Sequence, residues 1–213
     1  MEYKNLYIFD PDEGGDGLKV FGDDNPNTVE DCRISFKGCD IKKLDENISF
    51  INGCMCTVKN CTFENGIKLA LCGNGDYPNN DKFGKIIFEN CTFKNFGRRG
   101  IEAQDGITVI LKNCTISNWG VKEFFDVRSF ATWAHSRAKV KLYECHFEQT
   151  SFFQSGFINF FIDLANHIGN DINDHCLSLK SFIPGVCKGA YSTDDGTVYC
   201  YNCTKNKWWI YLE

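Results

Sequence analysis

The sequence contains little proline or methionine and no long apolar run. Only 4 of its 213 residues are proline and 2 are methionine, whereas glycine and phenylalanine each occur 19 times. Phenylalanine packs well on pleated strands and glycine suits tight turns, so this composition favours β structure. No apolar run reaches the roughly 18–20 residues that a membrane-spanning helix needs, and we expect no membrane partner.

An excess of basic charge is also missing. The formal net charge is −5, and phosphate backbones are bound by basic surfaces, so a nucleic-acid partner is not expected. A polyanionic ligand would need something other than bulk charge to hold it, and a bound divalent cation would serve. Residues 1–10 lack the charged-then-apolar pattern of a signal peptide.

Zinc-type spacing is absent although cysteine is abundant. The 13 cysteines include no pair of CxxC motifs, and Cys54 and Cys56 have no histidine pair near them in the sequence. The count is odd, so at least one cysteine lies outside any disulfide scheme.

Most of the cysteines belong to a repeat. Five segments share the order apolar, polar, polar, Cys, polar, apolar, and a shorter copy follows: 29–34, 58–63, 88–93, 111–116, 142–147 and 201–204. The first five of these cysteines, 32, 61, 91, 114 and 145, are 29, 30, 23 and 31 residues apart. Short alternating runs are typical of strands, and this period is typical of a solenoid. The repeat predicts a right-handed parallel β-helix with one Asn-Cys step in each coil.

The residue types at this step suggest how coils stack. Cysteine is small and apolar, so a column of free thiols can fill the interior, and we favour this over disulfides. Asn60, Asn90, Asn113 and Asn202 also begin Asn-Cys-Thr sequons. Asparagine tolerates the backbone of a bend and can bond the asparagine of the next coil, so we favour a structural ladder over glycosylation.

The chain is predicted to be one domain and a monomer. Residues 1–150 would form the coils, and 151–213 a last coil with an irregular cap over the open end. Within that part, residues 155–168 could form a strand pair or a short helix, and 208–212 a terminal strand.

Several segments resemble pectate lyases, the first family of polysaccharide lyases, in collinear order. The stretch 68–76 has a Lys, apolar residues, a Gly and an Asp in the family's order, after a strand containing Asn-Cys. The other matching segments are 16–22, 25–32, 98–106, 113–119 and 138–144, so the resemblance covers about residues 5–150.

The resemblance implies a secreted enzyme that cleaves pectate, an acidic polysaccharide, by calcium-assisted β-elimination. The lack of a signal-peptide pattern leaves a cytoplasmic location open. Carried over by position, Arg99 would be the base, and Lys68 and Gln104 would bind substrate. Asp31, with Asp40 and Asp45, would hold Ca²⁺, a cation that takes several oxygen ligands. The cation would stabilise the enolate that develops.

The chain departs from the family pattern at several of these positions. Ser49 stands where a third carboxylate is expected, Gln104 replaces a second Arg, and Cys32 replaces a His. Each candidate also has a structural explanation, as an ordinary charged turn for Arg98 and Arg99 or as a solvated side chain for Lys68 and the aspartates. The histidines show no ligand-pair spacing, so no catalytic histidine is expected. The alternative function is therefore a non-catalytic β-helix that binds carbohydrate or serves as a structural module.

Overall fold

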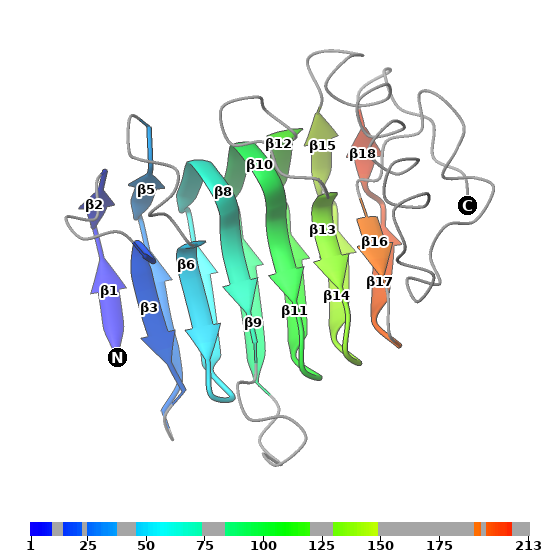
Figure 1. Ribbon diagram of the computed structural model, residues 1–213, viewed down its shortest axis with the longest axis horizontal. Helices are drawn as coiled ribbons and strands as arrows, with labels where there is room; N and C mark the ends of the chain where they lie inside the picture. The colour runs from blue at the N-terminus through cyan, green and yellow to red at the C-terminus, as the bar shows by residue number, and fades with distance from the viewer. Residues whose placement is uncertain are drawn as a thin grey trace, which may run out of the picture.

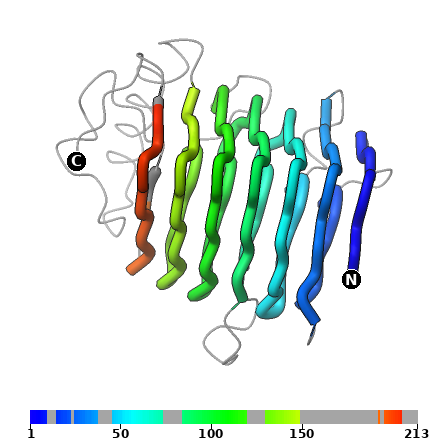
Figure 2. The backbone as a smooth tube through the Cα atoms, turned by 180° about the vertical axis from the view of Figure 1, so that it is seen from behind, coloured from blue at the N-terminus to red at the C-terminus, as the bar shows by residue number. Residues whose placement is uncertain are grey.

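The computed structural model describes residues 1–9, 15–22, 25–37, 46–73, 84–119, 130–148, 190–192 and 195–205. Its 18 strands pair in parallel and wind into a coil with three faces (Figure 1). The backbone path shows the coils stacked in sequence order from the N-terminus (Figure 2). The predicted parallel β-helix is confirmed. In the described part of the chain, no helix is long and apolar enough to traverse a lipid bilayer.

Face A is a seven-stranded sheet with one strand from each coil. Its strands in order are β1 (Glu2–Lys4), β4 (Asn27–Glu30), β7 (Met55–Lys59), β9 (Lys85–Glu89), β11 (Thr108–Lys112), β14 (Lys139–Tyr143) and β17 (Thr197–Tyr201).

Face B follows face A across one corner. Its strands are β2 (Tyr7–Ile8), β5 (Arg33–Ser35), the first half of β8 (Thr62–Cys72), the first half of β10 (Thr92–Ala103), β12 (Thr115–Trp119), β15 (His146–Glu148) and β18 (Thr204–Lys205).

Face C completes each coil. It contains β3 (Leu18–Phe21), β6 (Glu46–Ile51), the second halves of β8 and β10, β13 (Phe130–Ala134) and β16 (Ala190–Ser192). β8 and β10 bend from face B to face C, and the register between them shifts between Phe96 and Arg99.

Asparagine makes the corner between faces A and B. The corner residues share a positive φ: Asn5, Asp31, Asn60, Asn90, Asn113, Glu144 and Asn202. Short amide and carboxylate side chains tolerate this left-handed backbone better than most residues do. The Asn60 amide donates to Asp31 Oδ1 at 3.1 Å, and the Asn113 amide donates to Asn90 Oδ1 at 2.9 Å. The predicted structural ladder is therefore present.

A second ladder, which the sequence did not reveal, lies between faces B and C. The Asn65 amide donates to Ser35 Oγ at 2.9 Å, the Asn95 amide to Asn65 at 3.4 Å, and the Asn118 amide to Asn95 at 3.1 Å. All three asparagines have positive φ.

The cysteines after the first corner point into the core as free thiols. Cys61 donates to the carbonyl of Lys59 at 3.1 Å and to that of Val29, in the preceding coil, at 3.7 Å. Cys91 and Cys114 repeat both contacts in their own coils. The ten cysteines of the described segments are all unbridged, and Cys200 is exposed. The cysteines of the first five repeat units are buried, as predicted for packing residues: 32, 61, 91, 114 and 145.

Aromatic stacking fills the core beside this column. Phe63 and Phe93 are in register on β8 and β10, and their ring centroids lie 5.2 Å apart in a stacked arrangement. Phe88 meets Phe93 edge-on from face A at the same centroid distance of 5.2 Å. Burying a side chain of this size stabilises the fold by roughly 1.5–3 kcal/mol.

Strands β16 to β18 add a further coil after β15, and its corner at Asn202 matches the weak sixth copy of the repeat. The segments predicted as a cap, 155–168 and 208–212, lie outside the described residues.

Candidate functional site

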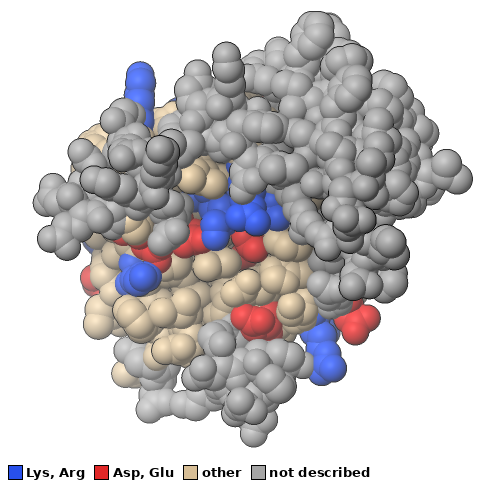
Figure 3. All heavy atoms as spheres, viewed as in Figure 1, with Lys and Arg blue, Asp and Glu red and all other residues tan. Residues whose placement is uncertain are grey.

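Face C carries a cluster of charged and aromatic side chains that come from six different strands or corners. We call it the face C cluster, and its members are Asp16, Glu46, Lys68, Arg99, Glu102, Trp133 and His135. On the side of the molecule seen in Figure 3, basic atoms lie directly beside acidic atoms across the middle of the strands. Glu46, Arg99 and Glu102 are buried, which is unusual for charged residues without a functional or pairing role.

Lys68 and Arg99 are brought together by sheet register. They are Cα partners on β8 and β10, and Glu46 and Phe130 flank them on the neighbouring strands. Lys68 forms an ion pair with Glu46 and keeps 20% of its side chain exposed. Lys68 and Arg99, the predicted substrate-binding residue and the predicted base, therefore lie on successive coils of one face.

Arg99 is fully buried within this face. Its guanidinium carbon lies 4.1 Å from the centre of the Trp133 ring and 4.9 Å from that of Phe130. A guanidinium this close to aromatic faces is stabilised by cation–π attraction, about 2 kcal/mol or more when it is desolvated. A base must reach the carbon-bound proton of a substrate, and this position offers no exposed surface for it.

Asp16 and Glu46 form a pair of neighbouring carboxylates, and Glu46 is the ion-pair partner of Lys68. The Ser49 hydroxyl donates to Asp16 Oδ2, and the Glu46 backbone N–H donates to Asp16 Oδ1 at 3.4 Å. Lys19 Nζ approaches Asp16 at 3.5 Å. Burial and the negative charge of Asp16 raise the pKa of Glu46 to about 7, although Lys68 acts in the opposite direction. Near neutral pH, Glu46 is therefore partly protonated and neutralises Lys68 only in part.

Glu102, on β10, and His135, just after β13, form a second pair. His135 Nε2 lies 3.4 Å from Glu102 Oε1, and its ring stacks on Trp133 with centroids 4.1 Å apart. Burial alone would raise the pKa of Glu102, but His135, Arg99 and Lys68 together lower it below its ordinary value. Glu102 is thus a carboxylate at neutral pH, and it counters the charges of Arg99 and Lys68.

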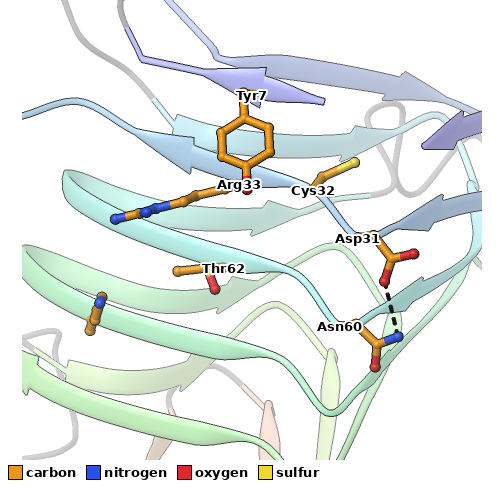
Figure 4. A pocket seen from close by; sticks show the side chains of 7 residues that line it. Tyr7, Asp31, Cys32, Arg33, Asn60 and Thr62 are labelled. Carbon is orange, nitrogen blue, oxygen red and sulfur yellow. Dashed lines mark hydrogen bonds between the residues drawn. The ribbon is translucent and has the colours of Figure 1, made fainter. Parts of the chain in front are cut away.

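Asp31 lies elsewhere, at the corner between faces A and B. Figure 4 shows its carboxylate turned toward Asn60, while Arg33 extends away from it. Both line a pocket of about 390 Å³ together with Tyr7, Thr62 and Lys94. The structure does not bring Asp31 to Lys68 and Arg99, because the chain crosses all of face B between that corner and face C.

Beside this pocket, charged side chains on face B form a network of ion pairs. Glu64 accepts from Arg33 Nε at 2.8 Å and pairs with Lys94 at 3.0 Å. Burial opposes ionisation of Glu64, but the two cations hold its pKa below the ordinary value.

Gln104 follows β10 at the third corner, between faces C and A. Its backbone N–H donates to the carbonyl of Cys72 at 2.9 Å, and its side-chain amide lies against Gly73. It therefore borders the face C cluster near the end of β10.

Asp40 and Asp45 lie outside the described residues. Over the stretches of chain that the structure describes, no three Asp, Glu, His or Cys side chains are grouped so that they could hold a metal ion. The calcium site stays a prediction.

Sequence reasoning missed Glu46, Glu102 and His135. The repeat gave an indication for Glu102 alone: aligning the coils on their Asn-Cys steps gives its position relative to Asn90. It could not show that Glu46 lies on the same face.

Comparison with known proteins agrees with the coil geometry. A family model described as "right handed beta helix region" matches residues 27–204, which is most of the chain. No curated protein and no solved structure gives a significant match. The match runs from the first residue of β4 to the first residue of β18, and with it the handedness predicted from the repeat is confirmed. The chain belongs to the right-handed β-helix family.

Proposed function

We propose that face C binds a chain of acidic sugars, with Lys68 as the cation that meets the sugar carboxylates and the exposed part of Trp133 as an apolar contact. The observation that carries this proposal is the in-register placement of Lys68 and Arg99 on adjacent coils of one face, beside Trp133. Strands stacked in parallel repeat at about 4.8 Å, so an extended polymer lying across the coils meets successive strands of the same face.

Lys68 is suited to this role because its charge is only partly countered. Glu46, its ion-pair partner, has a pKa of about 7 and carries a fractional charge near neutral pH. A carboxylate from a ligand can therefore replace Glu46 as the partner of the exposed ammonium group. Arg99, fully buried against Trp133, adds a fixed positive charge beneath the surface.

Trp133 supplies the apolar part of the surface. It lies between the buried Arg99 and the ring of His135 and remains partly exposed. Because Arg99 and His135 cover the faces of this ring, a sugar would meet only the part of the indole that remains exposed. Ligand sites generally combine such apolar contacts with a few polar groups.

The catalytic version of this proposal is calcium-dependent β-elimination with Arg99 as the base, as the resemblance to pectate lyases implies. The described residues do not assemble a calcium site, and Arg99 is fully buried. The burial of Arg99 favours the binding module over the lyase, and we derive no step that uses calcium.

The test is binding to polygalacturonate, compared with a neutral polysaccharide of similar length, by affinity electrophoresis. Lys68→Ala is expected to weaken binding to the acidic polymer by about tenfold or more, the loss of one charge-assisted contact. Lys112→Ala is the matched control, because Lys112 pairs with Glu89 at 2.9 Å on face A. Equal binding by the wild type and Lys68→Ala would exclude the proposed site.

The lyase is tested separately. Formation of the ultraviolet-absorbing unsaturated product is followed on polygalacturonate with calcium and then with chelator. Calcium-dependent product that disappears in Arg99→Ala would establish elimination, and no product at high protein concentration would leave the binding function alone.

A further inference from the structure

The corner between β13 and β14 holds two consecutive non-glycine residues with positive φ. Ser136 has a φ of 50° and Arg137 a φ of 65°. A bulky or hydroxylated side chain in the left-handed region costs about 1–3 kcal/mol and persists only where the surroundings enforce it, often at functional sites. Here the backbone is held by the Gly106 N–H, which donates to the carbonyl of Ser136 at 2.9 Å, and by the Ala138 N–H, which donates to that of His135 at 3.0 Å.

This corner places a hydroxyl, an imidazole and a carboxylate in series. Ser136 Oγ lies 3.0 Å from His135 Nδ1, and His135 Nε2 lies 3.4 Å from Glu102 Oε1. The first distance suits proton transfer. Across the second distance His135 Nε2 makes no hydrogen bond in this structure, and catalytic hydrogen bonds often tighten only when substrate binds. We assign the neutral tautomer with its proton on Nε2, because Nε2 faces a carboxylate and Nδ1 faces a hydroxyl.

Exposure increases along the series. Glu102 and His135 expose only 10% and 15% of their side chains, whereas Ser136 lies partly exposed on the turn. The Trp133 ring covers one side of the imidazole at 4.1 Å and fixes its orientation. The carboxylate and base are thus held in place behind a hydroxyl that a ligand can reach, which is the arrangement of an activated nucleophile.

We infer that Ser136, His135 and Glu102 form an acyl-transfer site that hydrolyses ester groups carried by the bound polysaccharide. The inference rests on the proposed function for its substrate class, because Trp133 belongs to both sites. The chemistry requires neither a metal nor a redox partner.

The reaction proceeds in two stages. The Ser136 hydroxyl gives its proton to His135 Nδ1 as Oγ attacks the ester carbonyl, and Glu102 stabilises the imidazolium through the Nε2 proton. The tetrahedral intermediate expels the sugar alkoxide, which takes the proton from Nδ1, and the acyl group stays on Oγ. Water then attacks the acyl-serine, gives one proton to Nδ1, and releases the carboxylic acid as that proton returns to Oγ. The sum is ester plus water to acid plus alcohol.

The experiment uses p-nitrophenyl acetate and O-acetylated polygalacturonate, with release of nitrophenol and acetate as readouts. A fluorophosphonate probe is added, because it labels activated serines. The wild type is expected to hydrolyse both substrates and to be labelled. Ser136→Ala is expected to lose labelling and at least about 100-fold in rate, since removing a nucleophile leaves only binding effects. Glu102→Gln is expected to retain labelling but to slow hydrolysis about tenfold or more.

Ser136→Gly separates chemistry from folding. Glycine adopts positive φ without strain, so this variant should melt at the same temperature as the wild type or higher while losing hydrolysis and labelling. Thr57→Ala, on face A, is the control and should match the wild type. Absence of wild-type hydrolysis, or unchanged activity in Ser136→Gly, overturns the inference.

The two proposals fail independently. If polygalacturonate binds face C but no ester is cleaved, the acyl-transfer site is wrong and the binding function stands. If p-nitrophenyl acetate is cleaved through Ser136 but polygalacturonate does not bind, the acyl-transfer site stands and its substrate class is wrong.

Discussion

Replacing Glu46 with glutamine removes the titration of one buried carboxyl and should change how stability depends on pH. Glu46 releases its proton near pH 7 in the folded chain, whereas its ordinary pKa is 4.5. Between these two values the folded state binds more protons than the unfolded state, so the free energy of unfolding of the wild type falls as pH rises. The glutamine of the variant cannot titrate, so this loss disappears.

The structure sets the size of the effect. A shift from 4.5 to about 7 corresponds to at most about 3 kcal/mol, at 1.36 kcal/mol for each pKa unit. At about pH 5 the wild type has already lost part of this contribution to its stability. The stability of Glu46→Gln relative to the wild type should therefore rise by about 2 kcal/mol between about pH 5 and pH 8. Glu64 and Glu102, whose pKa values are lowered, lose their contribution only below the ordinary value of 4.5, outside this window.

The measurement is urea unfolding at both pH values, followed by tryptophan fluorescence. Asp16→Asn should reduce the wild-type pH dependence, because Asp16 is one cause of the raised pKa of Glu46. Glu30→Gln is the control: Glu30 pairs with Lys4 at the surface, so its effect should stay within about 1 kcal/mol at both pH values. A difference between Glu46→Gln and the wild type that does not change with pH would refute the reasoning.

Three further predictions concern the coil. Cys91→Ala should lower the free energy of unfolding by about 1–2 kcal/mol, because it leaves a cavity in a fully packed column; an unchanged urea midpoint would contradict this. Asn90→Ala should cost about 1–2 kcal/mol in thermal unfolding and Asn90→Gly less, because φ is 55° at this corner; equal costs would show that the amide ladder, and not the backbone, dominates. Arg99→Lys should lower the melting temperature and alter tryptophan fluorescence, because the ammonium group of lysine cannot stack on Trp133 as the planar guanidinium does. The expected cost is about 1–2 kcal/mol, and a variant as stable as the wild type would argue against the cation–π contact.

The coil could be predicted from the sequence because its determinants are local. Asparagine at a left-handed corner, cysteine facing inward after it and alternating apolar residues on both sides recur within six residues. Each feature follows from backbone sterics or burial at that position, and none depends on a distant contact.

The site could be predicted only in part because it depends on register across loops. Counting from the corner asparagine places Lys68 eight residues after Asn60, but eight residues after Asn90 comes Arg98. The partner of Lys68 is Arg99, because the register shifts by one residue after Phe96. One residue of slip sends a strand's side chains to the opposite face, so such a shift decides which residues meet.

The position of Asp31 shows the same limit. Stacking on Asn60 was correctly expected from the repeat, and the amide–carboxylate bond between them is present. Membership of successive coils does not place two residues on one face, however, and Asp31 lies a whole face away from Lys68. Conversely, Ser136 and His135 follow β13, away from the Asn-Cys step of their coil at Asn113, so the repeat did not indicate them.

The two asparagine ladders have a direction. At each rung the amide donor belongs to the later coil and the acceptor to the earlier one: Asn60 donates back to Asp31, Asn113 to Asn90, and Asn95 to Asn65. A chain that leaves the ribosome from its N-terminus therefore presents completed acceptors to each coil as the coil is made. Assembly on the ribosome can proceed one turn at a time, with each finished turn acting as the template for the next.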